Sequence, residues 1–177
     1  MNRRALLLAG VAWPVTGWTQ SCGALTPEDM EGPFYKAGAP SRVSLVEPAS
    51  RAPRLVLTGA VAGRDCKPLA GVLLDFWHAD EAGAYDNSGF RYRGVVKADA
   101  QGRYRLETNM PPPYMGRPRH IHVKLLRPGA PALTTQLYFP GEARGADPAL
   151  VVKMERDKGA GKERDAALSA QYDFRVG

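Results

Sequence analysis

Residues 110–123 read Met110-Pro111-Pro112-Pro113-Tyr114-Met115-Gly116-Arg117-Pro118-Arg119-His120-Ile121-His122-Val123. The prolines are incompatible with a central strand, whereas polar and apolar residues alternate from His120 onward. In an extended strand, side chains two residues apart project from the same face, about 7 Å apart. His120 and His122 therefore share one face, and Ile121 points into a hydrophobic core. The stretch predicts a half-buried strand that follows a rigid loop carrying Tyr114 and Arg117.

Similar short segments recur along the 177-residue chain, separated by turns in a sequence that holds 19 glycines and 15 prolines. Regularly spaced short strands are typical of a β-sandwich. The predicted fold class is all-β, a single β-sandwich domain with an N-terminal arm and a short C-terminal helical tail. We expect strands at 55–62, 72–77, 95–98, 103–108, 120–127 and 133–139, and tail helices at 149–155 and 166–170.

The N-terminus has the pattern of an export signal. Arg3 and Arg4 are followed by an apolar segment from Ala5 to Trp18 and then by polar residues, a pattern too short for a membrane span. The paired arginines resemble a bacterial twin-arginine signal. A lipoprotein anchor on Cys22 is the competing interpretation. We expect an exported protein in the periplasm or outside the cell, with no stable membrane span.

The predicted organisation is an export signal at 1–21, an arm at 22–54 and a β-sandwich catalytic domain at 55–177. Without the signal, which holds two arginines and no acidic residue, the formal charge falls from +6 to +4. The basic residues are scattered among acidic ones, a pattern that argues against nucleic acid as a partner. A mild positive surplus is better suited to attracting a small organic anion.

The chain has two cysteines, Cys22 and Cys66. An oxidising compartment permits a disulfide bond between them. A buried free Cys66 beside a turn is the alternative, because a sequence does not show whether two cysteines lie within bonding distance.

A His-x-His pair alone is compatible with iron, copper or zinc. Tyrosines that reach the same point narrow the choice, because phenolate is a hard anionic ligand suited to a ferric ion. Two imidazoles and two phenolates would leave a ferric ion with a net charge of about +1, which a hydroxide neutralises. That last position would be open to substrate.

The motifs of this chain resemble those of the intradiol ring-cleaving dioxygenases, whose best-known member is protocatechuate 3,4-dioxygenase. They follow the order of that family and span roughly residues 27–141. The matching segments are Glu31-Gly32-Pro33-Phe34-Tyr35, Cys66-Lys67-Pro68-Leu69-Ala70-Gly71, Gly83-Ala84-Tyr85-Asp86, Gly102-Arg103-Tyr104, Pro113-Tyr114, Arg117-Pro118-Arg119-His120-Ile121-His122 and Leu133-Thr134-Thr135-Gln136-Leu137-Tyr138-Phe139.

The resemblance implies that Tyr85, Tyr114, His120 and His122 bind a non-haem ferric ion, with Tyr114 and His122 axial and hydroxide as a fifth ligand. A catechol would bind as a dianion and displace the hydroxide and Tyr114, each of which can take up a substrate proton. Molecular oxygen would then attack the ring. Cleavage between the two hydroxyl-bearing carbons would pass through an anhydride and give a muconate-type diacid.

The resemblance also implies roles for residues that do not bind the metal. Arg117 would stabilise negative charge on the ring during oxygen attack. Gln136 would hold that arginine and the ring. Gly32 and Pro33 match the segment that closes over the substrate, where glycine lets the backbone approach a ligand. The expected partners are a small aromatic diol and molecular oxygen, and a homo-oligomer is possible.

Several polar residues near these motifs have ordinary structural interpretations. We expect Tyr138 in the core or at its rim, and His78 as a satisfied polar residue at a strand end. Arg91, Arg93 and Arg119 are either surface charges or candidates for binding an anionic substituent on the ring.

Two functions from other classes compete with the enzyme. The first is a secreted, non-catalytic β-sandwich module that binds catechols or ferric chelates. The second is a His-x-His copper or zinc protein. The sequence does not indicate which catechol is used. It has no helical N-terminal segment like that of the catechol 1,2-dioxygenases, which disfavours that branch.

Overall fold

A computed structural model describes residues 23–156 and 167–177, so the predicted export signal and Cys22 lie outside the described residues. The described part is almost entirely β-structure, as predicted. Its elements are β1 (Arg54–Gly63), β2 (Leu73–Trp77), β3 (Arg93–Lys97), β4 (Arg103–Asn109), β5 (His120–Leu126), β6 (Leu133–Tyr138), the 3₁₀ turn η1 (Pro148–Leu150), β7 (Lys153–Arg156), β8 (Leu168–Gln171) and β9 (Phe174–Val176).

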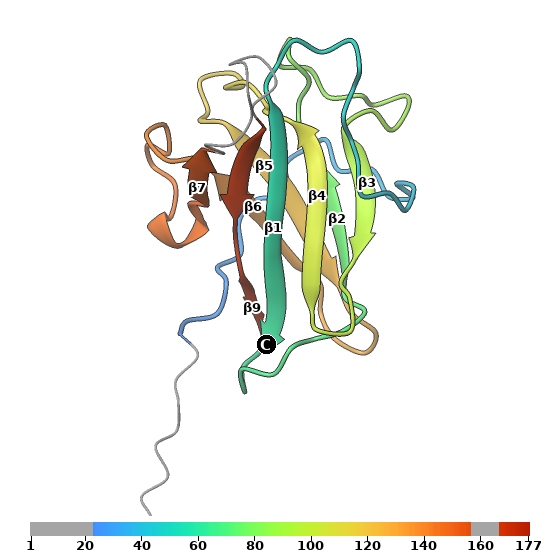
Figure 1. Ribbon diagram of the computed structural model, residues 1–177, viewed down its shortest axis with the longest axis vertical. Helices are drawn as coiled ribbons and strands as arrows, with labels where there is room; N and C mark the ends of the chain where they lie inside the picture. Colours follow the sequence, from blue (N-terminus) through green and yellow to red (C-terminus); the bar gives the residue numbers. More distant parts are fainter. Residues whose placement is uncertain (1–22, 157–166) are drawn as a thin grey trace, which may run out of the picture.

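The described strands form two packed sheets (Figure 1). One sheet has the order β4-β1-β8-β7, and β9 also pairs with β1; the other has the order β3-β2-β5-β6. Strand β5 lies between β2 and β6 and is antiparallel to both. The β-sandwich prediction is therefore confirmed, and the strand that carries the two histidines is central in its sheet.

The core lies between the two sheets. Leu74 and Phe76 on β2, together with Ile121 and Val123 on β5, are at most 2% exposed and belong to one hydrophobic cluster. Across the sandwich, the ring centroids of Phe76 and Tyr104 are 5.9 Å apart. Because side chains alternate along a strand, the residues between these core positions face the opposite side of the four-stranded sheet.

The predicted C-terminal helices are wrong. Residues 149–155 contain the end of η1 and most of β7, and β8 covers 168–171. Strand β8 runs parallel to β1 and pairs Ala170 with Leu57, and β9 pairs with the other half of β1. Burial of Ala170 against the core, with ladder hydrogen bonds, outweighs the helical preference of an alanine-rich segment.

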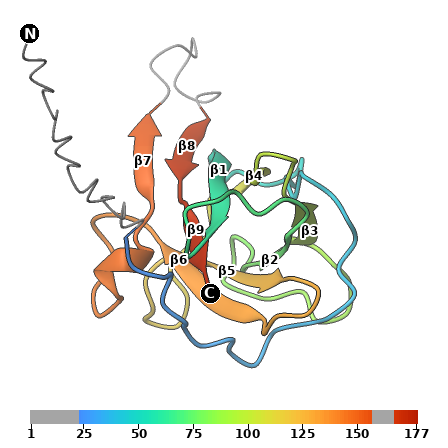
Figure 2. The same cartoon turned by 90° about the horizontal axis from the view of Figure 1, so that it is seen from below.

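The segment before β1 lies across the sandwich and is here called the arm, residues 23–53. Its backbone pairs with both sheets at their open edge, through bridges from Ser41 to Val95 on β3 and from Ser44 to Glu107 on β4. Leu45, which follows the second bridge, is 1% exposed and belongs to the core. Figure 2 shows the start of the arm, in blue, on the side of β5 and β6 that faces away from β1.

Two further observations bear on the predictions about export and cysteines. Cys66 is exposed and disulfide-bonded rather than buried and free, and its predicted partner Cys22 is outside the described residues. Within 23–156 and 167–177, no helix has the length and apolar character needed to cross a membrane.

Candidate metal centre

The outer face of the four-stranded sheet carries a row of large polar and aromatic side chains. His122 on β5 pairs in register with Trp77 on β2 and with Gln136 on β6, and Trp77 pairs with Arg93 on β3. All four are at most 3% exposed, although none of them faces the core between the sheets. Something must therefore cover this face, and the arm and the loop between β2 and β3 do so.

Tyr85 comes from that loop and points at both histidines. Its hydroxyl oxygen lies 3.2 Å from Nε2 of His120 and 3.1 Å from Nε2 of His122. Metal–imidazole bonds are about 2 Å long, so donor atoms that share one ion lie roughly 3 Å apart. The structure therefore brings three of the four predicted ligands, one phenol and two imidazoles, to a separation that fits a single ion.

Neighbouring groups fix the two histidines in different ways. Nδ1 of His120 lies 2.7 Å from the carbonyl oxygen of Pro118, which can only accept, so His120 carries its proton on Nδ1 and presents a lone pair at Nε2. The His122 ring stacks on Trp77, with centroids 4.8 Å apart and planes 8° apart. Among the described residues, Nδ1 of His122 has no hydrogen-bond partner. Stacking, rather than a hydrogen bond at Nδ1, orients His122.

Burial keeps these groups in their neutral forms while no cation is bound. It lowers the pKa of His122 to about 2 and lowers the pKa of His120, so both imidazoles are available as ligands. Burial also raises the pKa of Tyr85. The positive charges of Arg117 and Arg93 partly offset this rise. A phenolate at Tyr85 therefore requires a bound cation, which is the chemistry expected of a tyrosine ligand.

Tyr114 lies at the edge of this group. A tight turn joins it to Arg117, with backbone hydrogen bonds of 3.1 and 2.7 Å between the two residues. Its ring meets the Tyr85 ring edge-on, with centroids 5.4 Å apart. Within the described chain, no hydrogen bond joins the Tyr114 hydroxyl to either histidine. The fourth predicted ligand is thus adjacent to the other three but less buried than Tyr85.

Arg117 is held in a network that includes Gln136, as the sequence predicts, and two residues that it does not. Its Nη2 donates to Oε1 of Gln136 at 2.8 Å and to the hydroxyl of Tyr138 at 3.1 Å. The Tyr138 hydroxyl donates to Oδ2 of Asp29 on the arm at 2.8 Å. Tyr138 therefore links the arm to Arg117 and is not only a core or rim residue. The sequence could have indicated this role, because Tyr138 lies two residues after Gln136 and therefore on the same face of β6.

The arm passes directly over His122. Gly32 has φ +70°, and a β-carbon added there would lie 3.6 Å from Cε1 of His122. Pro33 follows on the exposed side of the chain. The next residue, Phe34, stacks on Tyr85 with centroids 4.6 Å apart and planes 13° apart, and meets Tyr114 edge-on at 6.0 Å. The segment predicted to close over the substrate therefore lies against the candidate ligands, and Phe34 is a contact that the sequence did not reveal.

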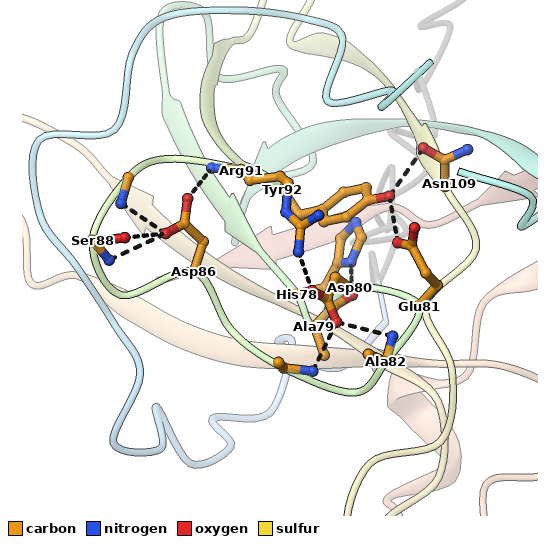
Figure 3. Close-up of polar contacts among 12 residues, drawn as sticks. His78, Ala79, Asp80, Glu81, Ala82, Asp86, Ser88, Arg91, Tyr92 and Asn109 are labelled. Atoms are coloured by element: carbon orange, nitrogen blue, oxygen red, sulfur yellow. Dashed lines mark hydrogen bonds and ion pairs between the residues drawn. The ribbon is translucent and has the colours of Figure 1, made fainter. Parts of the chain in front are cut away.

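Two carboxylates shape the loop that presents Tyr85 (Figure 3). Oδ1 of Asp80 accepts from the backbone N–H groups of Ala82 and Ala84, at 3.0 and 2.9 Å. Asp86 accepts backbone hydrogen bonds from Ser88, Gly89 and Arg91, which hold its pKa down to about 2. Tyr85 thus sits between two turns that are closed by carboxylates. No sequence argument had assigned these carboxylates to the site.

The remaining polar residues near the site are already engaged. His78 lies 2.7 Å from both the Ala79 carbonyl and the Thr108 hydroxyl, which agrees with a satisfied histidine at a strand end. Figure 3 shows the contact between His78 and Ala79, together with the ion pair between Arg91 and Asp80. Arg119 binds Glu142 on the protein surface.

A second polar cluster lies one pairing position further along the same sheet face, where Asp75 on β2 pairs with Lys124 on β5. Tyr35 of the arm donates to Oδ2 of Asp75 at 3.1 Å, and Lys124 reaches both the Tyr35 ring, at 4.1 Å, and Glu31, at 2.6 Å. Burial raises the pKa of Asp75 to about 6, although its hydrogen bond and the charges of Arg93 and Lys124 oppose that shift.

Two surface hollows lie away from these residues. Cavities of about 380 and 340 Å³ lie beside the start of the arm and the C-terminal strand, and neither is lined by a candidate ligand. The candidate centre is recognised by its converging donor atoms.

Comparisons with known proteins are consistent with this geometry. The family model described as "Dioxygenase" matches residues 30–176. The structure of the dioxygenase domain of a dioxygenase carbohydrate-binding protein fusion from Streptomyces sp. SirexAA-E is 47% identical, with a TM-score of 0.78, and the match covers 86% of this chain and 98% of that one. The structure of 3-chlorocatechol 1,2-dioxygenase from Rhodococcus opacus 1CP is 27% identical, with a TM-score of 0.77, covering 86% and 72%.

Curated proteins that are similar in sequence are also dioxygenases. Chlorocatechol 1,2-dioxygenase of Pseudomonas sp. (strain P51) is 37% identical over 166 residues, which cover 74% of this chain and 65% of that protein. Catechol 1,2-dioxygenase 1 of Acinetobacter lwoffii is 35% identical over 147 residues, covering 66% and 47%. The chain thus spans about half to two thirds of the length of these relatives. Both are named as 1,2-dioxygenases of catechol or chlorocatechol, so these similarities do not support the expectation that the chain lies outside that branch.

The raised pKa of Asp75 predicts a pH-dependent stability. Below about pH 4 the carboxyl is protonated in both the folded and the unfolded chain. Between about pH 4 and 6 the unfolded chain loses this proton while the folded chain keeps it, so the free energy of unfolding falls as pH rises, by on the order of 3 kcal/mol in total. Asp75→Asn keeps a polar partner for Tyr35 and removes this loss.

The measurement is urea unfolding of metal-free wild-type and Asp75→Asn protein at pH 4 and pH 7. We expect Asp75→Asn to gain stability relative to the wild type at pH 7. If the free energies of unfolding of the two proteins differ by the same amount at both pH values, Asp75 does not titrate between them.

Proposed function

The chain belongs to the intradiol ring-cleaving dioxygenase family, and from that membership we propose that it opens a catecholic ring between the two hydroxyl-bearing carbons with molecular oxygen. The observation that carries the proposal is the convergence of the Tyr85 hydroxyl on Nε2 of His120 and of His122, at 3.2 and 3.1 Å. The product would be a muconate-type diacid.

We propose a non-haem ferric ion as the cofactor, held by Tyr85, His120, His122 and Tyr114. The donor set supports this choice, since phenolate favours a hard trivalent ion and imidazole is compatible with iron. When bound, such an ion would withdraw electron density from a catecholate and activate its ring toward oxygen. The residues of the chain supply orientation, charge and proton transfer.

The two tyrosines are suited to different tasks. Tyr85 is 9% exposed, is stacked under Phe34 and points at both histidines, so it is held in place. Tyr114 is more exposed and sits at the end of a tight turn. We propose that Tyr114 takes up a substrate proton at its hydroxyl oxygen, because it has fewer contacts to lose when it moves.

Arg117 supplies the fixed positive charge. Its hydrogen bonds to Gln136 and Tyr138 hold the guanidinium beside the candidate ligands before any substrate binds. A charge held in advance stabilises negative charge that develops on the ring without reorganisation at the moment of reaction. Gln136 also donates to the backbone oxygen of Met30 at 2.7 Å, so the same side chain fixes Arg117 and the arm.

We propose that the substrate ring carries no carboxylate. The three arginines that could bind such a group have partners within the protein: Arg119 binds Glu142, Arg91 binds Asp80, and Arg93 donates to backbone carbonyls. The arm also brings Asp29 and Glu31 to this face of the sheet, where they disfavour a second anion. The relatives named for catechol and chlorocatechol support the same substrate class.

Export is proposed on the sequence pattern alone. Residues 1–21 lie outside the described part of the structure, so the expected periplasmic or extracellular location rests on Arg3, Arg4 and the apolar segment that follows them.

Tyr85→Phe tests the ligand assignment. Protein loaded with ferric ion is expected to be wine-red through tyrosinate-to-metal charge transfer, and Tyr85→Phe should bleach or shift this band because one phenolate is lost. The measurement is the visible spectrum at a known iron content. Tyr172→Phe is the matched control, since its hydroxyl binds the Ala149 carbonyl outside the site. An unchanged spectrum in Tyr85→Phe would remove Tyr85 from the metal shell.

Arg117→Ala tests the fixed charge. We expect the visible band to persist and kcat for oxygen uptake with catechol to fall about 10²–10³-fold, the usual effect of removing one preorganised stabilising group. Arg119→Ala is the control from the same loop and should keep its turnover, because Arg119 is paired with Glu142. Full activity in Arg117→Ala would disprove the assigned role.

Oxygen uptake with three substrates tests the substrate class. We expect kcat/KM for catechol and 4-chlorocatechol to exceed that for protocatechuate more than tenfold. The reverse order would overturn the proposal of an uncharged ring and leave ring cleavage intact. No uptake with any of them, by protein that binds iron, would contradict the enzymatic function itself.

A further inference from the structure

Arg93 lies where the arm, the Tyr85 loop and the four-stranded sheet meet. It is the first residue of β3 and is 1% exposed. Its Nε donates to the carbonyl oxygen of Asp86 at 2.8 Å, and its Nη1 donates to the carbonyl oxygen of Phe34 at 2.7 Å. Nη2 lies 3.4 Å from Oδ1 of Asn87. One guanidinium thus binds two chain segments that are far apart in sequence.

This cation has an unusual environment. Among the described residues, no carboxylate forms an ion pair with Arg93; its direct partners are two backbone carbonyls and one amide. Burying a charge is costly unless its hydrogen bonds are satisfied in good geometry. A planar guanidinium can donate in two directions at once, which a lysine ammonium on a flexible stem does not reproduce. The geometry therefore favours a specific role over a general contribution to stability.

The two carbonyl groups that accept from Arg93 lie beside the stacked rings of Phe34 and Tyr85. Phe34 presents its carbonyl to Arg93 and its ring to Tyr85, at 4.6 Å between centroids. Asp86, which supplies the other carbonyl, is the residue next to Tyr85. Arg93 therefore fixes the backbone on both sides of the Phe34–Tyr85 stack.

We propose that Arg93 is a positioning residue for the candidate metal centre: by joining the Phe34 carbonyl to the Asp86 carbonyl, it holds the Phe34 ring against Tyr85 and so fixes the direction of the Tyr85 hydroxyl. The inference rests on the proposed function to the extent that Tyr85 is a metal ligand. The two hydrogen bonds from Arg93 to these carbonyls, here called the clamp, are present in the protein without metal.

Other cations attach the arm to the same loop further from Tyr85. Lys36 donates to the carbonyls of Ser88 and Gly89 at 2.7 and 3.1 Å. Arg42 donates to the carbonyls of Phe90 and Arg93. These contacts fasten the arm without touching the residues beside the aromatic stack. Arg42→Lys is therefore a matched control for Arg93→Lys, since both variants keep the charge and lose a forked donor.

The test uses the full chain in two states. In metal-free protein, amide hydrogen exchange is measured at residues 34–35 and 84–88. In protein loaded with ferric ion, the visible band is recorded at equal iron content. We expect Arg93→Lys to speed exchange at both segments at least tenfold and to shift the band, because Tyr85 is no longer held. Arg42→Lys should leave the band at its wild-type position.

Two results would overturn the proposal. Exchange at wild-type rates in Arg93→Lys would show that the guanidinium does not hold these segments, and an unmoved band would show that Tyr85 does not depend on it. If Arg93→Lys does not fold, Phe34→Leu decides, since it keeps the clamp and removes the ring: a shifted band supports the proposal and an unmoved band overturns it.

Failure of the proposed function gives a different result. Wild-type protein that develops no visible band with ferric ion and consumes no oxygen with catechols would disprove the metal centre. Hydrogen exchange in the metal-free variants would still show whether Arg93 joins the arm to the Tyr85 loop.

Discussion

The alternation of inward and outward side chains along β5 sets both the packing of the sandwich and the geometry of the candidate site. Ile121 and Val123 face the core between the sheets, and His120 and His122 face outward. A shift of the strand by one residue would put both imidazoles in the apolar core and the apolar side chains on the polar outer face, so the hydrophobic effect itself fixes the register. The same burial that stabilises the sandwich thus aims both histidines at one point.

The row of polar groups on the outer face of this sheet is covered by other parts of the chain. If solvent reached it, the desolvation that lowers the pKa values of the two histidines would be lost. The arm provides this cover, and three of its anchors come from the sheet beneath it. Tyr138 binds Asp29, Gln136 binds the Met30 carbonyl, and Lys124 binds Glu31. The segment next to these anchors then passes over His122. The strands that carry the two histidines therefore also anchor part of the cover.

The electrostatics of the site follow from this burial. Desolvation keeps the histidines neutral and opposes ionisation of Tyr85, so in the absence of a cation the site is a cluster of neutral donors. Two guanidiniums, those of Arg117 and Arg93, are fixed close enough to favour negative charge at Tyr85. An arrangement that is unfavourable for an isolated phenolate becomes favourable once a cation shares it. The protein without metal thus already holds neutral, oriented donor atoms that a cation can bind.

The strand that carries His120 and His122 and the sandwich class could be predicted from the sequence, because alternation and turn chemistry are local properties of the chain. The contact between Arg117 and Gln136 was expected only from the family resemblance, since the two residues are 19 positions apart. The roles of Tyr138, Asp29 and Arg93 depend on long-range packing, since each acts through a partner distant in sequence. It also decided the C-terminal strands, where pairing with β1 overrides a local helical preference. Local patterns set which way a side chain faces, and long-range packing sets what it meets there.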